Sequence, residues 1–115
     1  MERVRATRDR RIQYKDPIRV QRGDLVRVGE EDSDHPGWWW CTAIDAKQGW
    51  VPSDVLAAGV RTGATVRVVA DYESTELPLQ HGDLLDVEQR HAGWLLVRNA
   101  EDKIGWVPAS HVEPA

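Results

Sequence analysis

The stretch Gly49-Trp50-Val51-Pro52 decides the fold, because it returns 56 residues later as Gly105-Trp106-Val107-Pro108. Two shorter markers return in the same order: Gly37-Trp38 is followed by Gly93-Trp94, and Gly23-Asp24 is followed by Gly82-Asp83. Three markers repeated at nearly one spacing indicate an internal duplication. Two copies are too few for a solenoid, so we predict two small tandem domains.

The repeat divides the 115-residue chain into predicted domains at residues 1–59 and 60–115. The segment 57–64 contains two glycines and is predicted to link them. Domains of under 60 residues bury only a modest part of their surface, so they need dense packing. The chain has six tryptophans and no phenylalanine, so tryptophan is predicted to supply the aromatic core.

Short apolar segments separated by Gly, Pro and Asp turns predict strands throughout the chain. No segment shows apolar residues at the spacing of an amphipathic helix. The predicted fold is therefore all-β, with two small barrels. Residues 89–92 are predicted to form a loop. The alternation of Val4 and Ala6 indicates a weak strand near the start. The other predicted strands are 18–21, 25–28, 38–44, 49–51, 66–70, 84–87, 94–98 and 104–107.

Composition argues against several classes of function. The only cysteine, Cys41, excludes an intramolecular disulfide and is predicted to be a small core residue. Its solitary thiol and the absence of a signal-like segment predict a cytoplasmic protein. No apolar run is long enough to span a membrane. The four histidines show no metal-site spacing, and no nucleophile elbow or phosphate loop is present. We therefore predict no enzymatic activity, no metal and no cofactor.

The second repeat resembles a Src-homology-3 (SH3) domain, a family that opens on Ala-Leu-Tyr-Asp-Tyr. Val68-Val69-Ala70-Asp71-Tyr72 stands in that place, and Glu76-Leu77-Pro78-Leu79 resembles the Glu-Leu-Ser-Phe that follows it. Gly93-Trp94-Leu95 and Gly105-Trp106-Val107-Pro108 resemble the Gly-Trp-Trp and Gly-x-Val-Pro of the family. The first repeat shares the later markers but shows no such opening motif in residues 4–20. It resembles a variant SH3 domain of the type found in bacterial proteins.

The resemblance implies a protein–protein adaptor that binds a proline-rich peptide, held as a polyproline II helix, in an aromatic groove. It places Tyr72, Trp94 and Pro108 in the groove of the second domain, with His111 where the family has a tyrosine. Glu73 and Glu76 are the acidic residues that would pair with a ligand Arg or Lys.

For the first domain the resemblance implies a poorer groove at Trp38 and Pro52, because Val55 replaces the last tyrosine. Tyr14 is a further candidate for this groove. Glu30, Glu31, Asp32 and Asp34 offer an acidic loop. Trp38 and Trp94 would either contact a ligand or pack between the domains, and the residues favour neither.

Three alternatives remain at this point. The main one is a structural scaffold in which the two grooves pack together. Nucleic-acid binding is opposed by a net charge of −4 and a pI near 5.5, although residues 1–22 hold eight basic and three acidic side chains. Binding to cell-wall peptidoglycan would require export.

Overall fold

The computed structural model describes residues 1–12 and 16–115, and these residues form strands and two short 3-10 helices. The all-β class is therefore confirmed. The chain divides into two compact units, which are described separately. Unit 1 combines Met1–Lys15 with Thr75–Ala115, and unit 2 is the continuous stretch Asp16–Ser74.

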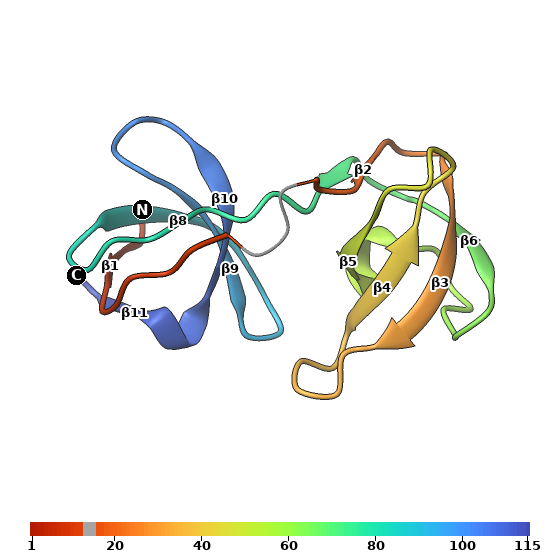
Figure 1. The fold of residues 1–115 in the computed structure, drawn as a ribbon, viewed down its shortest axis with the longest axis horizontal. Coiled ribbons are helices and arrows are strands. Elements are labelled where there is room, and N and C mark those ends of the chain that lie inside the picture. Colours follow the sequence, from red (N-terminus) through yellow and green to blue (C-terminus); the bar gives the residue numbers. More distant parts are fainter. Residues whose placement is uncertain (13–15) are drawn as a thin grey trace. The chain divides into compact units, whose positions relative to one another are not determined.

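Unit 1 is a five-stranded antiparallel sheet in the order β10-β9-β8-β1-β11. The N-terminal strand, red in Figure 1, lies between β8 and β11, which come from the other end of the sequence. Its elements are β1 (Arg3–Ala6), β8 (Leu84–His91), β9 (Trp94–Arg98), β10 (Ile104–Pro108), the 3-10 helix η2 (Ala109–His111) and β11 (Val112–Pro114).

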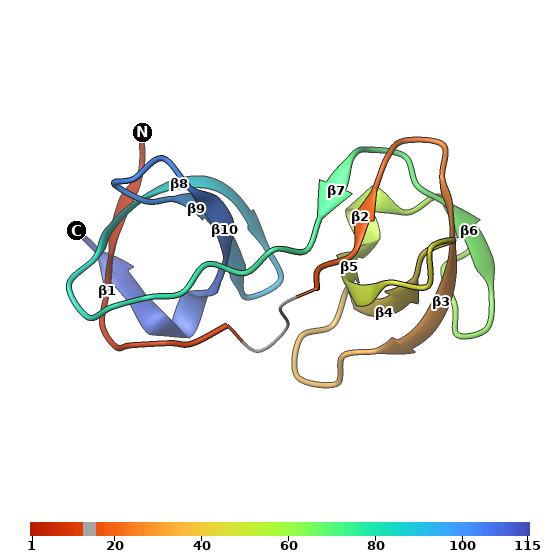
Figure 2. The same cartoon turned by 45° about the horizontal axis from the view of Figure 1, so that its top comes forward.

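Unit 2 has a four-stranded antiparallel sheet, β5-β4-β3-β6, and a separate pair, β2-β7. Figure 2 shows β2 and β7 side by side, where Arg19 pairs with Glu73 and Val20 with Tyr72. Its elements are β2 (Arg19–Val20), β3 (Leu25–Glu31), β4 (Trp38–Thr42), β5 (Gln48–Pro52), the 3-10 helix η1 (Ser53–Val55), β6 (Thr65–Arg67) and β7 (Tyr72–Glu73).

The two sequence repeats exchange their opening strands, so that each compact unit contains the opening strand of the other repeat. In unit 1, Val4 of β1 pairs with Leu85 of β8. In unit 2, Val66 of β6 pairs with Val26 of β3. Leu85 and Val26 occupy the same position of the repeat, two residues after Asp83 and Asp24. The first strand of each repeat therefore completes the sheet of the other repeat in the same register.

This exchange divides the chain differently from the predicted domains at 1–59 and 60–115. Those ranges describe the sequence repeats, whereas each compact unit contains parts of both. The predicted linker, 57–64, lies inside unit 2: the Ala57 amide donates to the Arg67 carbonyl at 2.9 Å, and the Gly63 amide donates to the Val28 carbonyl at 2.8 Å. The chain instead crosses between the units near residues 15 and 74.

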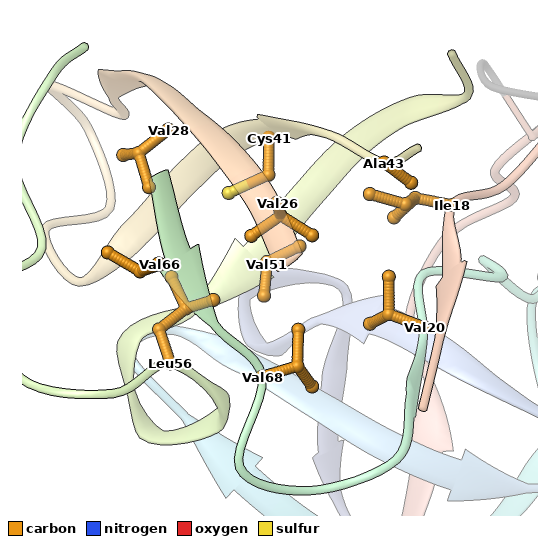
Figure 3. Close-up of a cluster of buried hydrophobic side chains, with 10 residues drawn as sticks. All are labelled: Ile18, Val20, Val26, Val28, Cys41, Ala43, Val51, Leu56, Val66 and Val68. Atoms are coloured by element: carbon orange, nitrogen blue, oxygen red, sulfur yellow. The ribbon is translucent and has the colours of Figure 1, made fainter. Parts of the chain in front are cut away.

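Each unit has its own aliphatic core. Figure 3 shows the cluster of unit 2, which is rich in valine and includes the fully buried Cys41, as predicted for that residue. Trp39 packs against this cluster from a partly buried position. Trp38 and Trp106 are buried as well, at 4% and 5% exposed, so tryptophan supplies the aromatic part of the core as predicted, beside clusters of β-branched and other aliphatic residues. The core of unit 1 consists of Val4, Ala6, Leu77, Leu79, Leu85, Leu95, Val97 and Val107.

Two predicted loops contain strand. β8 continues to His91 through a register shift between Val87 and Gln89, so the prediction of a loop at 89–92 is wrong. The extra residue of this bulge lets a polar segment stay paired with β9. β7 and β11 were not predicted, because strands of two or three mostly polar residues carry no alternation and form only beside a partner.

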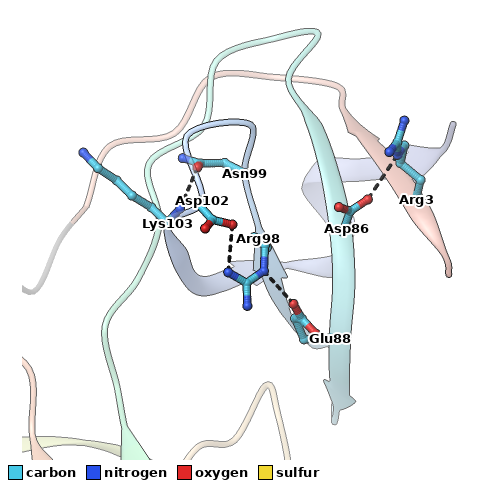
Figure 4. A network of polar contacts seen from close by, with 7 residues as sticks. All are labelled: Arg3, Asp86, Glu88, Arg98, Asn99, Asp102 and Lys103. Atoms are coloured by element: carbon cyan, nitrogen blue, oxygen red, sulfur yellow. Dashed lines mark hydrogen bonds and ion pairs between the residues drawn. The ribbon is translucent and has the colours of Figure 1, made fainter.

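Exposed ion pairs join the strands of unit 1 on its surface. Arg3 on β1 pairs with Asp86 on β8 at 3.1 Å. Arg98 bridges Glu88 at 3.0 Å and Asp102 at 2.9 Å (Figure 4). The hairpin after β9 is closed by the Asn99 side-chain oxygen, which accepts hydrogen bonds from two backbone amides. Exposed pairs of this kind contribute about 0.2–1 kcal/mol each, so they adjust the sheet more than they hold it together.

Candidate functional site

The strand exchange separates the residues that were predicted to share one groove. Tyr72 and Glu73 lie on β7 of unit 2, whereas Trp94, Pro108 and His111 lie in unit 1. The predicted set of Tyr72, Trp94 and Pro108 is therefore not assembled within one unit. The physical cause is that β6, which precedes Tyr72, pairs with β3 and not with β8.

The place of Tyr72 in unit 1 is taken by Arg10. Val4 and Val66 are equivalent by register, and Arg10 and Tyr72 each follow them by six residues. The aspartates between them make the same contact: Asp9 accepts a hydrogen bond from the His81 amide at 2.7 Å, and Asp71 accepts one from the Arg22 amide at 2.8 Å.

The opening motif of the first repeat is therefore Ala6-Thr7-Arg8-Asp9-Arg10, which the sequence reading missed. It has lost both tyrosines but keeps the alanine and the aspartate. The signal that could have found it is the aspartate five residues after the valine of the strand, a spacing that holds in both repeats.

In unit 1 the site is built around Trp94, which is partly exposed and lies opposite the buried Pro108 on the neighbouring strand. The guanidinium carbon of Arg10 lies 5.2 Å from the centroid of the Trp94 ring, a cation–π distance. Arg10 Nη2 also pairs with Glu76 Oε1 at 2.7 Å. The Arg10 and Glu76 side chains are only 14% and 9% exposed, so this ion pair is largely shielded from water.

His111 lies beside the same arm. The amide of Thr7 donates to the His111 carbonyl at 2.8 Å, and Ser110 Oγ lies 3.0 Å from His111 Nδ1. Partial burial lowers the pKa of His111, and the positive charges of Arg8 and Arg10 lower it further. The predicted site residues Trp94, Pro108, His111 and Glu76 are thus accompanied by two arginines that the sequence did not suggest.

In unit 2 the corresponding tryptophan is covered. Trp38 is only 4% exposed and pairs across the sheet with the buried Pro52. Its ring is therefore not presented to a ligand in this structure. Tyr72 is partly buried, and its hydroxyl donates to the Trp50 carbonyl at 2.7 Å. The exposed Glu73 pairs with Arg19 at 3.4 Å.

The acidic loop of unit 2 is engaged in its own turns. Glu31 accepts a hydrogen bond from the Gly37 amide at 2.9 Å. Asp32 accepts one from the Asp34 amide at 2.9 Å and lies 3.5 Å from His35. Tyr14 lies outside the described residues. The better-formed candidate site is therefore the surface around Trp94 in unit 1.

The described residues give little support for a metal site, a reactive cysteine or a membrane-spanning helix. No group of three or more His, Cys, Asp or Glu side chains among them could hold a metal ion. Burial raises the pKa of the Cys41 thiol to about 12, so the thiol is protonated at neutral pH and is a poor nucleophile. In the same part of the chain, no helix has the length and apolar character to cross a membrane.

Each unit is a small antiparallel β-structure with a tryptophan opposite a proline, as the SH3 resemblance predicts. The family model of the variant SH3 domain matches residues 3–58 and 65–115. The chain belongs to the SH3 family, with two variant SH3 repeats in tandem. SH3 domains are generally protein-interaction modules without enzymatic activity.

The chain is also similar to mammalian proteins. It is 27% identical to mouse SH3 and PX domain-containing protein 2B, over 98% of this chain and 14% of that protein. The human 2B protein is 28% identical over 88% of this chain and 12% of its own length. Mouse SH3 and PX domain-containing protein 2A is 44% identical over 50 residues, which are 40% of this chain and 4% of that protein. The chain thus spans a small part of these relatives, and the bacterial type stays a prediction.

Proposed function

We propose that this chain is an adaptor segment that binds an extended peptide or protein segment over Trp94 of unit 1. The observation that carries the proposal is the contrast between the two repeats: Trp94 is partly exposed beside Pro108 and His111, whereas Trp38 is only 4% exposed. A partly exposed indole next to a proline offers the flat apolar slot in which a polyproline II ligand can insert its own prolines.

The principal site then differs from the groove that was predicted from the sequence. Tyr72 is replaced by Arg10, and the ligand surface comprises Arg8, Arg10, Trp94 and His111, with Pro108 below them. In unit 2, Tyr72 and Glu73 offer only a second, weaker surface, since Trp38 is covered and Pro52 is buried. Nucleic acid is a poor candidate ligand, because the chain has a net charge of −4 and unit 1 itself carries nine basic and nine acidic side chains, so it has no excess of positive charge.

A titration with proline-rich peptides of differing flanking charge tests the proposal. We expect the backbone and indole NMR signals of Trp94, together with those of His111, to shift at up to millimolar peptide. Trp94→Leu should weaken binding about tenfold or more, because a central aromatic contact commonly dominates such an interface.

Trp40→Leu is the matched control. Trp40 is also a partly buried indole, held edge-to-face against Trp50 at 5.2 Å in unit 2, so its loss should leave the affinity unchanged. If no peptide shifts the Trp94 signals, the binding proposal fails. The scaffold alternative would then be preferred.

A further inference from the structure

Arg10 occupies the position that a basic ligand residue would take in unit 1. The SH3 resemblance assigns Glu76 to a cation of the ligand, but Glu76 is already paired with Arg10 at 2.7 Å and is 8% exposed. The Arg10 guanidinium also lies over the Trp94 ring at 5.2 Å. A ligand arginine would have to displace Arg10 from both partners and bring a second positive charge beside it.

The remaining charges around the site are mainly positive. Arg8 is exposed and has no hydrogen bond or ion pair within the described residues. Asp9, between Arg8 and Arg10, is engaged elsewhere, because its carboxylate accepts a hydrogen bond from the His81 amide. The Thr7 amide donates to the backbone carbonyl of His111, and Arg8 and Arg10 lie close enough to the His111 side chain to lower its pKa. The surface therefore presents the exposed Arg8 near Arg10 and His111, while Glu76, the carboxylate that the resemblance assigns to a ligand cation, is buried and paired with Arg10.

We propose that the Trp94 surface of unit 1 selects peptides with acidic residues beside their apolar core, and rejects the arginine- or lysine-flanked peptides that the resemblance implies. This inference rests on the proposed function and names its ligand class. A carboxylate of the ligand pairs with Arg8 at the rim, and the apolar part of the ligand covers Trp94. Charge complementarity of this kind sets partner choice more than it sets affinity.

The test compares three peptides that share one proline-rich core and differ in their flanks: glutamates, serines or arginines. We expect the glutamate peptide to bind tightest and the arginine peptide weakest, with shifts at Trp94 and His111. The preference should diminish as salt is added, because the charges at the rim are screened.

Two variants locate the charge effect. Arg8→Gln should weaken binding of the glutamate peptide about two- to fivefold, the range expected for one exposed ion pair, and so reduce its advantage over the serine peptide. Arg27→Gln is the matched control, because Arg27 is an exposed strand residue of unit 2 and its loss changes the net charge equally. Arg10→Gln should release Glu76 and move the preference towards the arginine peptide.

The possible outcomes distinguish the preference for acidic peptides from peptide binding over Trp94 itself. If the arginine peptide binds as well as the glutamate peptide or better, the acidic preference is overturned while binding over Trp94 stands. The acidic preference is likewise overturned if all three peptides bind equally and Arg8→Gln does not change their affinities. If no peptide shifts the Trp94 signals, both the binding function and its preference fall. Should Arg10→Gln fail to fold, Arg8→Gln still decides, because Arg8 is exposed and unpaired within the described residues.

Discussion

At the scale of single residues, His111 reports on the charges that surround the Trp94 surface. Its pKa is lowered by partial burial and by Arg8 and Arg10, so the folded protein resists protonation of this imidazole. The unfolded chain therefore binds the proton more readily, and the stability contributed by neutral His111 is present above about pH 6.5. That contribution is lost as the pH falls through the folded pKa.

Removing one of these positive charges should return the pKa of His111 part of the way to its ordinary value. In Arg8→Gln the pKa of His111 is expected to rise towards its ordinary value, because one positive neighbour is gone. An NMR titration of the imidazole signals measures this directly, with Arg27→Gln as the control that should leave it unaltered. An unchanged His111 pKa in Arg8→Gln would mean that Arg8 does not face the imidazole.

Gly105 is constrained by the backbone that passes over it. A methyl group at this position would lie 2.8 Å from the Leu77 amide nitrogen and 2.9 Å from Leu77 Cβ. At Gly49 the nearest atoms are side-chain atoms, Ile18 Cγ2 at 2.7 Å and Ser74 Oγ at 2.8 Å. Close approach of a neighbouring segment therefore explains why the repeated motif begins with glycine.

Gly105→Ala is expected to destabilise the protein by about 1–3 kcal/mol, the usual cost of forcing extra volume into a packed site. Gly49→Ala should also destabilise the protein, because the added methyl would meet Cγ2 of the fully buried Ile18 and the Ser74 hydroxyl, which accepts a hydrogen bond from the Ile18 amide. Chemical denaturation of the two variants measures both values. Equal stabilities for Gly105→Ala and the native chain would contradict the close approach.

At the scale of elements, two long-range charge pairs favour the observed exchange of strands. In the observed arrangement Arg3 faces Asp86, and Arg27 faces the neutral Thr65. If each repeat kept its own strand, Arg3 would face Arg27, because Arg27 holds the position of Asp86 in the first repeat. Like charges opposite one another in a sheet are unfavourable. Arg10 would also lose Glu76, since Pro17 holds that position in the first repeat.

The strand exchange can be read directly from proton contacts in solution. We expect nuclear Overhauser effects between Val4 and Leu85, and between Val66 and Val26, as the observed pairing requires. Repeats that kept their own strands would instead connect Val4 with Val26 and Val66 with Leu85. The two patterns exclude each other, so one spectrum decides between them.

The sequence predicted most of the strands, because alternation, turn residues and the repeated motif are local signals. It could not predict which strand joins which barrel. Val4 and Val66 are both valines followed by arginine, so either fits the same gap between core residues. The choice depends on pairs more than 60 residues apart, such as Arg10 with Glu76, and no local pattern contains them. The candidate site was therefore predicted in part, with Trp94 and Pro108 found and Arg8 and Arg10 missed.

At the scale of the whole molecule, the two units differ in how they depend on the chain. Unit 2 is continuous, so a fragment of residues 16–74 contains all its strands. We expect this fragment to fold alone and to give the same amide spectrum as in the full chain. Disordered spectra from the fragment would show that unit 2 requires the rest of the chain.

Unit 1 is discontinuous and should behave differently. A fragment of residues 75–115 lacks β1, which lies between β8 and β11 in the sheet, and should be unfolded. Adding a peptide of residues 1–15 should restore the fold, aided by charge: the peptide has six basic and two acidic side chains, and the fragment has three and seven. Circular dichroism follows this complementation. A folded 75–115 fragment would contradict the requirement for β1.

The position of β1 in the sheet of unit 1 also determines the order in which the two units can fold during synthesis. Arg3 is made 83 residues before its partner Asp86. At about 5–20 residues per second, the first strand waits roughly 4–17 s for the strand beside it. During this interval the complete 16–74 segment can close its own barrel. Unit 2 can therefore fold during synthesis before unit 1, although the first strand of unit 1 is made earlier.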